Sequence, residues 1–207
     1  LEFSTYFPDA SILRITQTYR NSQELIFVAG KFIQKNRRQI PKELVSSKHL
    51  SHPIEVYYTK NPSQTLKNLL LTIDFREIFL LGRNQADIFP FFDEELIKGE
   101  GDTILYLPRP DLCLSFLTVH RAKGLEAEAV ILLHVVDQFL GFPNQIPEER
   151  VLRFVLSSSH YYPYEEERRL FYVALTRTKN KVYILSDSRC PSIFLKELPH
   201  DFTVIHI

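Results

Sequence analysis

The 207-residue chain is predicted to form an α/β domain built on a mostly parallel sheet. Strand-length apolar runs alternate along it with segments of helical periodicity, which is typical of a parallel sheet covered by helices. Two of the runs, 112–119 and 129–136, are almost continuously apolar. Such runs suit strands that are buried on both faces of the sheet.

Short apolar runs predict the remaining strands. They are expected at 12–16, 54–59, 77–81, 104–107, 181–186 and 202–207. A turn is predicted at 99–102 and an irregular connection at 137–163.

Helices are predicted where apolar residues recur every three or four positions. The first is capped by Asn21 or Ser22, and Glu24 stands at capping-box spacing from Asn21. Its apolar face is formed by Leu25, Val28, Ala29, Phe32 and Ile33, and it runs out near 35–38. Further helices are expected at 62–72, 87–98 (interrupted by Pro90), 165–179 and 192–198.

The helix at 165–179 has acidic residues in its first turns and basic residues at its other end. Both placements favour the helix dipole. Arg177, at the basic end, is therefore either an ordinary helix-terminal charge or a guanidinium aimed at a phosphate. The local pattern does not choose between these interpretations.

Composition limits the classes of function. The net charge is zero, so a nucleic-acid contact would have to be a local patch. Cys113 and Cys190 make no disulfide framework, which favours a reducing compartment. No apolar run is long enough to span a membrane, and the start has no signal-peptide pattern. The chain starts at Leu1 and contains no Met, as expected of an excised domain.

Several catalytic and metal motifs are absent from the sequence. It has no G-x-x-x-x-G-K-[ST], so no P-loop is predicted, and no CxxC, HExxH or G-x-S-x-G. No metal site is expected. His120 and Glu126 could serve in acid–base work or be ordinary loop residues. Tyr19 and Arg20 lie between a predicted strand and a helix, where α/β proteins place ligand-binding groups, or they are an ordinary loop pair.

Four segments, in order, resemble the conserved motifs of UvrD/Rep superfamily-one DNA helicases. Residues 18–22 (TYRNS) resemble motif IV and 80–84 (LLGRN) resemble motif IVa. Residues 118–126 (TVHRAKGLE) resemble motif V, and 166–177 (EERRLFYVALTR) resemble motif VI. The resemblance implies a single domain over 1–207, the second, RecA-like motor domain, which lacks the P-loop. Ala127-Glu128, where many members carry Phe-Asp, resembles the DNA helicase IV branch.

The resemblance also implies roles for individual residues at a nucleotide site. Tyr19 would stack on adenine, and Arg20 and Arg177 would reach the γ-phosphate, with Arg177 as the arginine finger. Glu126 would hold the ribose, and Gly124 belongs to the same loop. ATP with Mg²⁺ is the expected cofactor. The magnesium would be held mainly by an N-terminal RecA-like domain of the same polypeptide, so this chain alone is expected to be inactive.

Single-stranded DNA, or a junction with duplex DNA, is the implied partner, with no membrane involved. Thr118 and His120 would contact the DNA backbone. Arg121 and Lys123 add to that patch or are solvated charges, and Phe142 either stacks on a base or anchors its loop.

At the level of the whole protein, the resemblance implies a 3′→5′ helicase or translocase of the bacterial cytoplasm, associated with the nucleoid. About 34 residues separate Arg83 from Thr118, too few for the accessory domain that many relatives insert there, since a domain needs roughly 50. Two alternatives stay open. One is a non-catalytic RecA-like module that binds DNA or protein, and the other is a subunit fragment of a helicase–nuclease.

Overall fold

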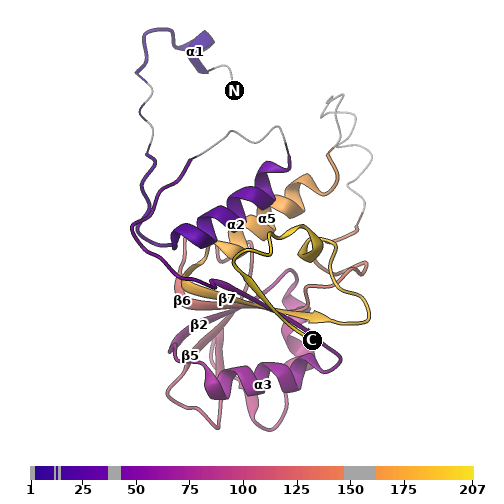
Figure 1. Cartoon of the computed structure of the whole chain (residues 1–207). Coiled ribbons are helices and arrows are strands. Elements are labelled where there is room, and N and C mark those ends of the chain that lie inside the picture. Colours follow the sequence, from indigo (N-terminus) through magenta and orange to yellow (C-terminus); the bar gives the residue numbers. More distant parts are fainter. Residues whose placement is uncertain (1–2, 12, 14, 37–42, 147–161) are drawn as a thin grey trace.

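The computed structural model in Figure 1 describes residues 3–11, 13, 15–36, 43–146 and 162–207. These residues form an eight-stranded sheet in the order β3-β4-β5-β2-β6-β7-β1-β8. The strands are β1 Ile54–Thr59, β2 Glu77–Gly82, β3 Leu96–Lys98, β4 Thr103–Tyr106, β5 Cys113–Thr118, β6 Ala127–Leu132, β7 Thr178–Asp187 and β8 Thr203–His206. All neighbours from β5 to β8 in this order are parallel, whereas β3 pairs with β4, and β4 with β5, in antiparallel fashion. The predicted α/β class with a mostly parallel sheet is confirmed.

Helices α2 Gln23–Gln34, α3 Pro62–Thr72 and α5 Glu165–Leu175 cover both faces of this sheet. The short helix α1 Phe3–Tyr6 lies away from the sheet, and the 3₁₀ turns are η1 Gln85–Phe91 and η2 Leu195–Glu197. In Figure 1, α2 and α5 lie side by side on one face and α3 lies on the other. None of the helices in the described ranges has the length and apolar character needed to cross a bilayer.

Apolar side chains of the central strands point alternately to the two faces of the sheet and so contribute to two hydrophobic cores. On β7, Val182 and Ile184 belong to the core under α2 and α5, whereas Tyr183 and Leu185 belong to the core over α3. Successive side chains of a strand point to opposite faces, so a run that is apolar at every position serves both layers. This is the arrangement that the apolar runs predicted.

Helix α2 begins where its cap was predicted. The Leu25 N–H donates to Ser22 Oγ at 3.3 Å. Asn21 takes no part in a capping box with Glu24, because its amide donates to the Thr178 carbonyl at 2.7 Å instead. Glu24 accepts from the Leu50 N–H at 2.8 Å. The cap residues therefore also tie the start of α2 to neighbouring segments.

The strand predicted at 12–16 is wrong for its described members. Leu13 and Ile15 are 91% and 80% exposed, and neither they nor Thr16 is in a strand. Ile12 and Arg14 lie outside the described residues. An apolar run forms a strand only where its backbone can pair with a neighbouring strand. Here the described backbone pairs next at Gln17, in an isolated parallel bridge to Val45.

The helix predicted at 87–98 is also wrong. The segment forms η1, a turn and the short strand β3. Pro90 supplies no N–H donor, and the Asp93 carboxylate accepts from the N–H groups of Glu95 and Leu96 at 2.9 and 3.0 Å. Such local side-chain bonds compete with helix formation.

Helix α5 ends at Leu175, earlier than predicted. Lys179 and Lys181 belong to β7 rather than to the helix end, because β7 begins at Thr178, opposite Ala127 of β6. The residues at 147–161, within the predicted irregular connection, lie outside the described ranges. The short helix predicted at 192–198 is reduced to the 3₁₀ turn η2.

Candidate functional site

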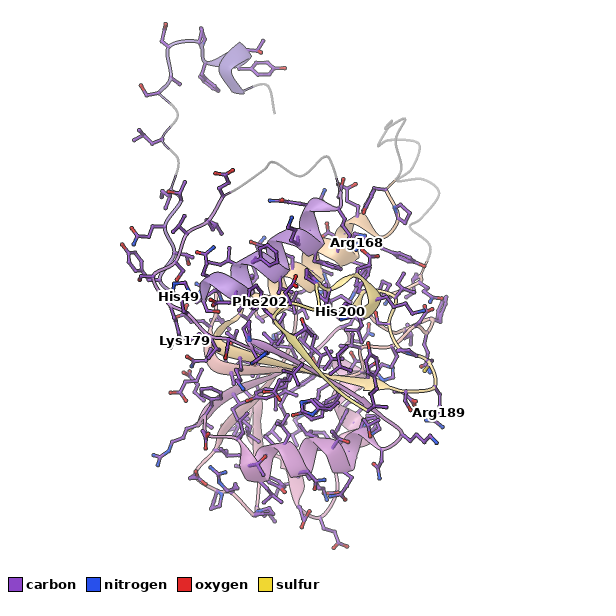
Figure 2. The ribbon with its side chains drawn as sticks, viewed as in Figure 1. His49, Arg168, Lys179, Arg189, His200 and Phe202 are labelled. Atoms are coloured by element: carbon purple, nitrogen blue, oxygen red, sulfur yellow. The ribbon has the colours of Figure 1, made fainter. Side chains whose placement is uncertain are left out.

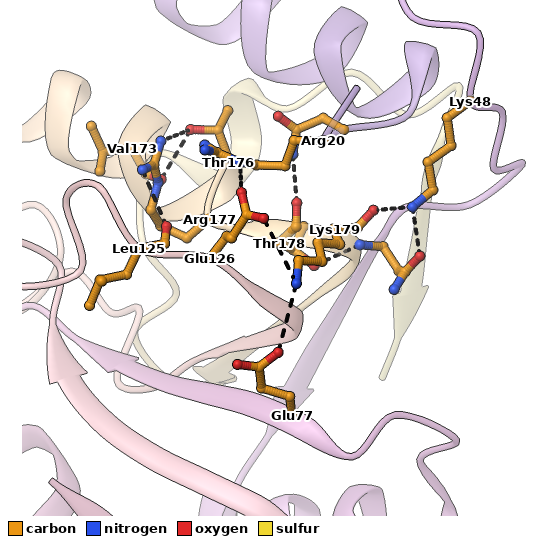
Figure 3. A network of polar contacts seen from close by, with 12 residues as sticks. Arg20, Lys48, Glu77, Leu125, Glu126, Val173, Thr176, Arg177, Thr178 and Lys179 are labelled. Carbon is orange, nitrogen blue, oxygen red and sulfur yellow. Dashed lines mark hydrogen bonds and ion pairs between the residues drawn. The ribbon is translucent and has the colours of Figure 1, made fainter. Parts of the chain in front are cut away.

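An open pocket of about 610 Å³ lies at the edge of the sheet where β6 and β7 begin. Four separate parts of the chain supply its walls. The lining residues are Gln17, Thr18, Tyr19, Arg20, Lys48, Glu126 and Lys179. Figure 3 shows the polar contacts of four of them, Arg20, Lys48, Glu126 and Lys179.

An ion pair between Arg20 and Glu126 crosses this pocket. Arg20 Nε donates to Glu126 Oε2, and the two side chains are 33% and 38% exposed. Lys179 Nζ lies 3.8 Å from the other carboxylate oxygen and 3.8 Å from Glu77 Oε2. The carboxylate of Glu126 therefore stands between two cations.

The loop before α2 and the segment around residue 48 are fixed to the start of β7. Lys48 Nζ donates to the Lys179 carbonyl and, at 2.8 Å, to Asn180 Oδ1. The bond from Asn21 to Thr178 adds a second attachment. In Figure 2, Lys179 lies on the same side of the molecule as His49, where α2 begins. These attachments hold Arg20 opposite Glu126.

Arg177 lies next to the pocket, just past the end of α5. Its Nε donates to the Val173 carbonyl at 3.0 Å, and its terminal nitrogens donate to the Leu125 carbonyl at 3.4 Å and to Thr176 Oγ1 at 3.3 Å. Burial and the like charge of Arg20 lower the pKa of the Arg177 guanidinium. Two guanidinium groups that repel each other make a neighbourhood in which a bound anion is favoured.

Tyr19 and Gly124 complete the predicted nucleotide set. The Tyr19 ring is 78% exposed at the pocket, so one of its faces is available for stacking. Gly124 has φ of +90° in the loop that leads to Glu126, a conformation in which glycine is favoured. The structure thus brings together Tyr19, Arg20 and Glu126, with Arg177 adjacent.

The residues predicted to contact DNA lie elsewhere. Thr118 ends β5 opposite Gly82 of β2, and His120 and Lys123 are exposed in the following loop. Because β5 and β6 are both parallel to β2, the end of β5 and the start of β6 are at opposite edges of the sheet. The loop 119–126 crosses from one edge to the other.

Two members of the predicted DNA set already have protein partners. Arg121 makes a bidentate pair with Asp102 at 2.7 and 2.8 Å. Phe142 is 1% exposed, and its ring packs against Phe171 and Phe194 with centroids 5.3 and 6.4 Å apart. In this structure Phe142 anchors its loop in the core and offers no face to a base.

Sequence patterns did not single out Lys48 or the pocket position of Lys179. Lys48 lies in a segment without periodicity, and it reaches the pocket through contacts 131 positions away. No sequence signal marks such a tertiary contact. Among the described residues, no group of three or more His, Cys, Asp or Glu side chains could hold a metal ion.

Comparison with known proteins finds similarity to DNA helicases. Residues 111–189 match the family model of the UvrD-like helicase C-terminal domain. The chain is 28% identical over 212 residues to DNA helicase IV of Escherichia coli (strain K12), an alignment that covers 95% of this chain and 28% of that protein. It is 30% identical over 185 residues to a probable DNA helicase of Mycoplasma pneumoniae, covering 84% of this chain and 31% of the relative.

A solved structure has a similar fold. It is the C-terminal domain of a possible DNA helicase from Lactobacillus plantarum WCFS1, with a TM-score of 0.56, 15% identity and coverage of 92% of this chain and 100% of that chain. The likeness is one of fold, an α/β sheet flanked by helices that resembles the domain in that structure. The chain is thus similar to the UvrD-like helicase C-terminal domain over residues 111–189 and to UvrD/Rep-like DNA helicases, as its motifs predicted. It spans less than a third of the length of the two curated relatives named above.

Proposed function

We propose that this chain is the second motor domain of an ATP-dependent DNA helicase or translocase that moves 3′→5′. The observation that carries the proposal is the meeting of Arg20, Glu126 and Arg177 at one edge of the sheet. The three residues come from separate motifs. Permanently charged, forked guanidinium groups suit phosphate recognition, and a carboxylate suits ribose hydroxyls.

The residues of the pocket fit a nucleotide. The exposed ring of Tyr19 can stack on a base, Glu126 can accept from sugar hydroxyls, and Arg20, Lys48 and Lys179 supply positive charge. Arg177 would neutralise charge that develops on the transferring phosphoryl group. Such an arginine finger contributes about 10³ to 10⁵ in rate. Mg²⁺ would be held mainly by the N-terminal RecA-like domain, which would also carry the P-loop.

The DNA strand would follow the opposite edge of the sheet, along Thr118 and His120, with Lys123 contributing charge. Phosphate contacts of this kind are independent of sequence. Closure of the two motor domains around ATP, and opening after hydrolysis, would then move the strand across them. The single domain 1–207 lacks half of the nucleotide site, so we expect it to hydrolyse no ATP alone.

The deciding experiment is Arg177→Ala in the full-length protein. Turnover in the presence of single-stranded DNA should fall by about 10³ or more, while nucleotide binding persists. The matched control is Arg169→Ala, which removes an exposed arginine from α5, the helix that precedes Arg177. A non-catalytic module would show no turnover to lose. Equal turnover in the two variants would contradict the arginine-finger role.

A further inference from the structure

A largely buried ion pair joins the segment after β2 to the start of helix α5. Arg83 Nε lies 2.9 and 3.0 Å from the carboxylate oxygens of Glu167, and its Nη2 lies 2.7 Å from Oε1. The side chains are only 19% and 11% exposed. Glu167 also accepts from the Asn144 N–H at 2.9 Å. A buried, bidentate pair with a third bond fixes the relative position of the segments that it joins.

One end of this pair stands at the predicted DNA edge. Arg83 directly follows Gly82, which pairs with Thr118, and the Val119 N–H donates to the Gly82 carbonyl at 3.0 Å. The neighbouring Asn84 amide donates to the Leu140 carbonyl at 2.7 Å. A displacement of the β2 and β5 ends would therefore move the Arg83 guanidinium.

The other end of the pair stands on α5, the helix that leads to Arg177. Glu167 lies in the first turn of α5, and Arg177 follows two residues after the last turn. At 1.5 Å per residue, α5 transmits a displacement over about 12 Å between Glu167 and Leu175. A helix is stiff over that length, so a shift at Glu167 reaches the guanidinium of Arg177.

From these contacts we propose that Arg83 and Glu167 are positioning residues. They couple the binding of single-stranded DNA at the ends of β2 and β5, near Gly82 and Thr118, to the position of the Arg177 guanidinium. This inference rests on the proposed function. The pair touches neither nucleotide nor DNA. It makes the position of the arginine finger depend on the end of β2, in addition to the backbone of the loop 119–126. DNA stimulation of ATP hydrolysis then depends on the pair.

The structure provides a matched control on the same helix. Arg168 makes an equally bidentate pair with Glu197 at 2.6 and 2.7 Å, with side chains 7% and 22% exposed. Glu197 belongs to η2, which follows β7 in the chain, and its other cationic partner is Lys35, just past the end of α2. Figure 2 shows Arg168 near the packed helices α2 and α5. A substitution at Glu197 therefore removes a comparable ion pair of α5 and leaves the predicted DNA edge, at the ends of β2 and β5, unchanged.

The experiment compares Glu167→Gln with Glu197→Gln in the full-length protein, using oligo-dT as the probe. ATP hydrolysis is measured with and without oligo-dT, and oligo-dT affinity by fluorescence anisotropy. We expect Glu167→Gln to lower the stimulation ratio about fivefold or more, with the DNA-free rate and the oligo-dT affinity kept. Glu197→Gln should keep the ratio. Arg83→Lys, which retains charge without the fork, should give an intermediate ratio and serves if Glu167→Gln does not fold.

Two results would overturn the inference. Glu167→Gln and Arg83→Lys could leave the ratio unchanged, as in Glu197→Gln. Alternatively, their ratio, DNA-free rate and oligo-dT affinity could all fall in step, as a purely structural pair would require. Failure of the proposed function looks different, because the unsubstituted protein itself would show no hydrolysis stimulated by oligo-dT.

Discussion

Arg20 and Glu126 are 106 positions apart in the sequence, yet Arg20 Nε donates to Glu126 Oε2 across the candidate nucleotide pocket. The cation proposed to reach a phosphate is thus held by the carboxylate proposed to hold the ribose. Both side chains are about one-third exposed, so the pair is easily exchanged for another partner. A polyphosphate entering the pocket would compete with Glu126 for Arg20.

This competition predicts the effect of Glu126→Gln on the isolated chain. Freed from the ion pair, Arg20 should bind inorganic tripolyphosphate about 1.5- to 5-fold more tightly, the range expected from an exposed pair. The measurement is a calorimetric or competition titration at low salt, and the difference should shrink as salt is added.

The matched control for this variant is Glu77→Gln. The Glu77 carboxylate also faces Lys179, at 3.8 Å, so the substitution removes the same charge near the pocket while Arg20 stays paired with Glu126. Equal tightening in both variants would mean that net charge, rather than release of Arg20, controls the affinity.

Gly124, in the loop before Glu126, predicts that a substitution there lowers the stability of the fold. At φ of +90° a Cβ is disfavoured by the backbone itself, although the space around it is open. Gly124→Ala should lower the free energy of unfolding by about 1 kcal/mol or more. Gly30→Ala, within α2 and also unobstructed, should raise it by about 0.5–1 kcal/mol. Urea denaturation of the isolated chain measures both, and a stabilising Gly124→Ala would contradict the conformation of the loop.

The Arg168–Glu197 pair predicts part of the acid sensitivity of the fold. Burial alone would raise the pKa of Glu197, but the hydrogen bonds and charge of Arg168, with Lys35, hold it below its ordinary value of 4.5. A carboxylate with a lowered pKa stabilises the fold above its unfolded pKa, and this stabilisation is lost as the pH falls through the folded pKa.

The measurement is the unfolding free energy of the isolated chain from neutral pH down through pH 4.5 and below. Glu197→Gln should be less stable at neutral pH and should lose less stability on acidification. Glu94→Gln, on an exposed turn, controls for the change in net charge. Parallel pH curves for Glu197→Gln and the unsubstituted chain would rule out this contribution.

Local signals were sufficient for part of the fold. Both β1 and α3 have the predicted bounds. For α3 the start is marked in the sequence, because Asn61 caps the helix and Pro62 occupies its first turn. The described part of 12–16 and the segment 87–98 were predicted wrongly, since pairing with other segments and turn hydrogen bonds decide their structure. Periodicity alone carries no information about such partners.

In the candidate site, too, some residues could be predicted from the sequence and others could not. Motif resemblance selected Tyr19, Arg20 and Glu126, which the structure gathers in one pocket. It could not select Lys48, whose contacts lie 131 and 132 positions away, or the pairing of Arg83 with Glu167 across 84 positions. These contacts exist only once the chain is folded. No local pattern in a single sequence indicates which charges will meet.

The aromatic packing beneath α5 predicts the largest loss of stability. Phe171 is fully buried, with ring centroids 5.1 to 5.5 Å from those of Phe32, Phe142 and Phe194. Phe171→Ala would leave a cavity at a site where several rings meet, costing about 3–5 kcal/mol. Phe139→Ala, at a ring that is 60% exposed, should change stability by only about 0.5 kcal/mol. Urea denaturation of both variants tests this contrast. Similar midpoints would mean that α5 is not held by this cluster, and the path from Glu167 to Arg177 would then lose the rigid helix on which it depends.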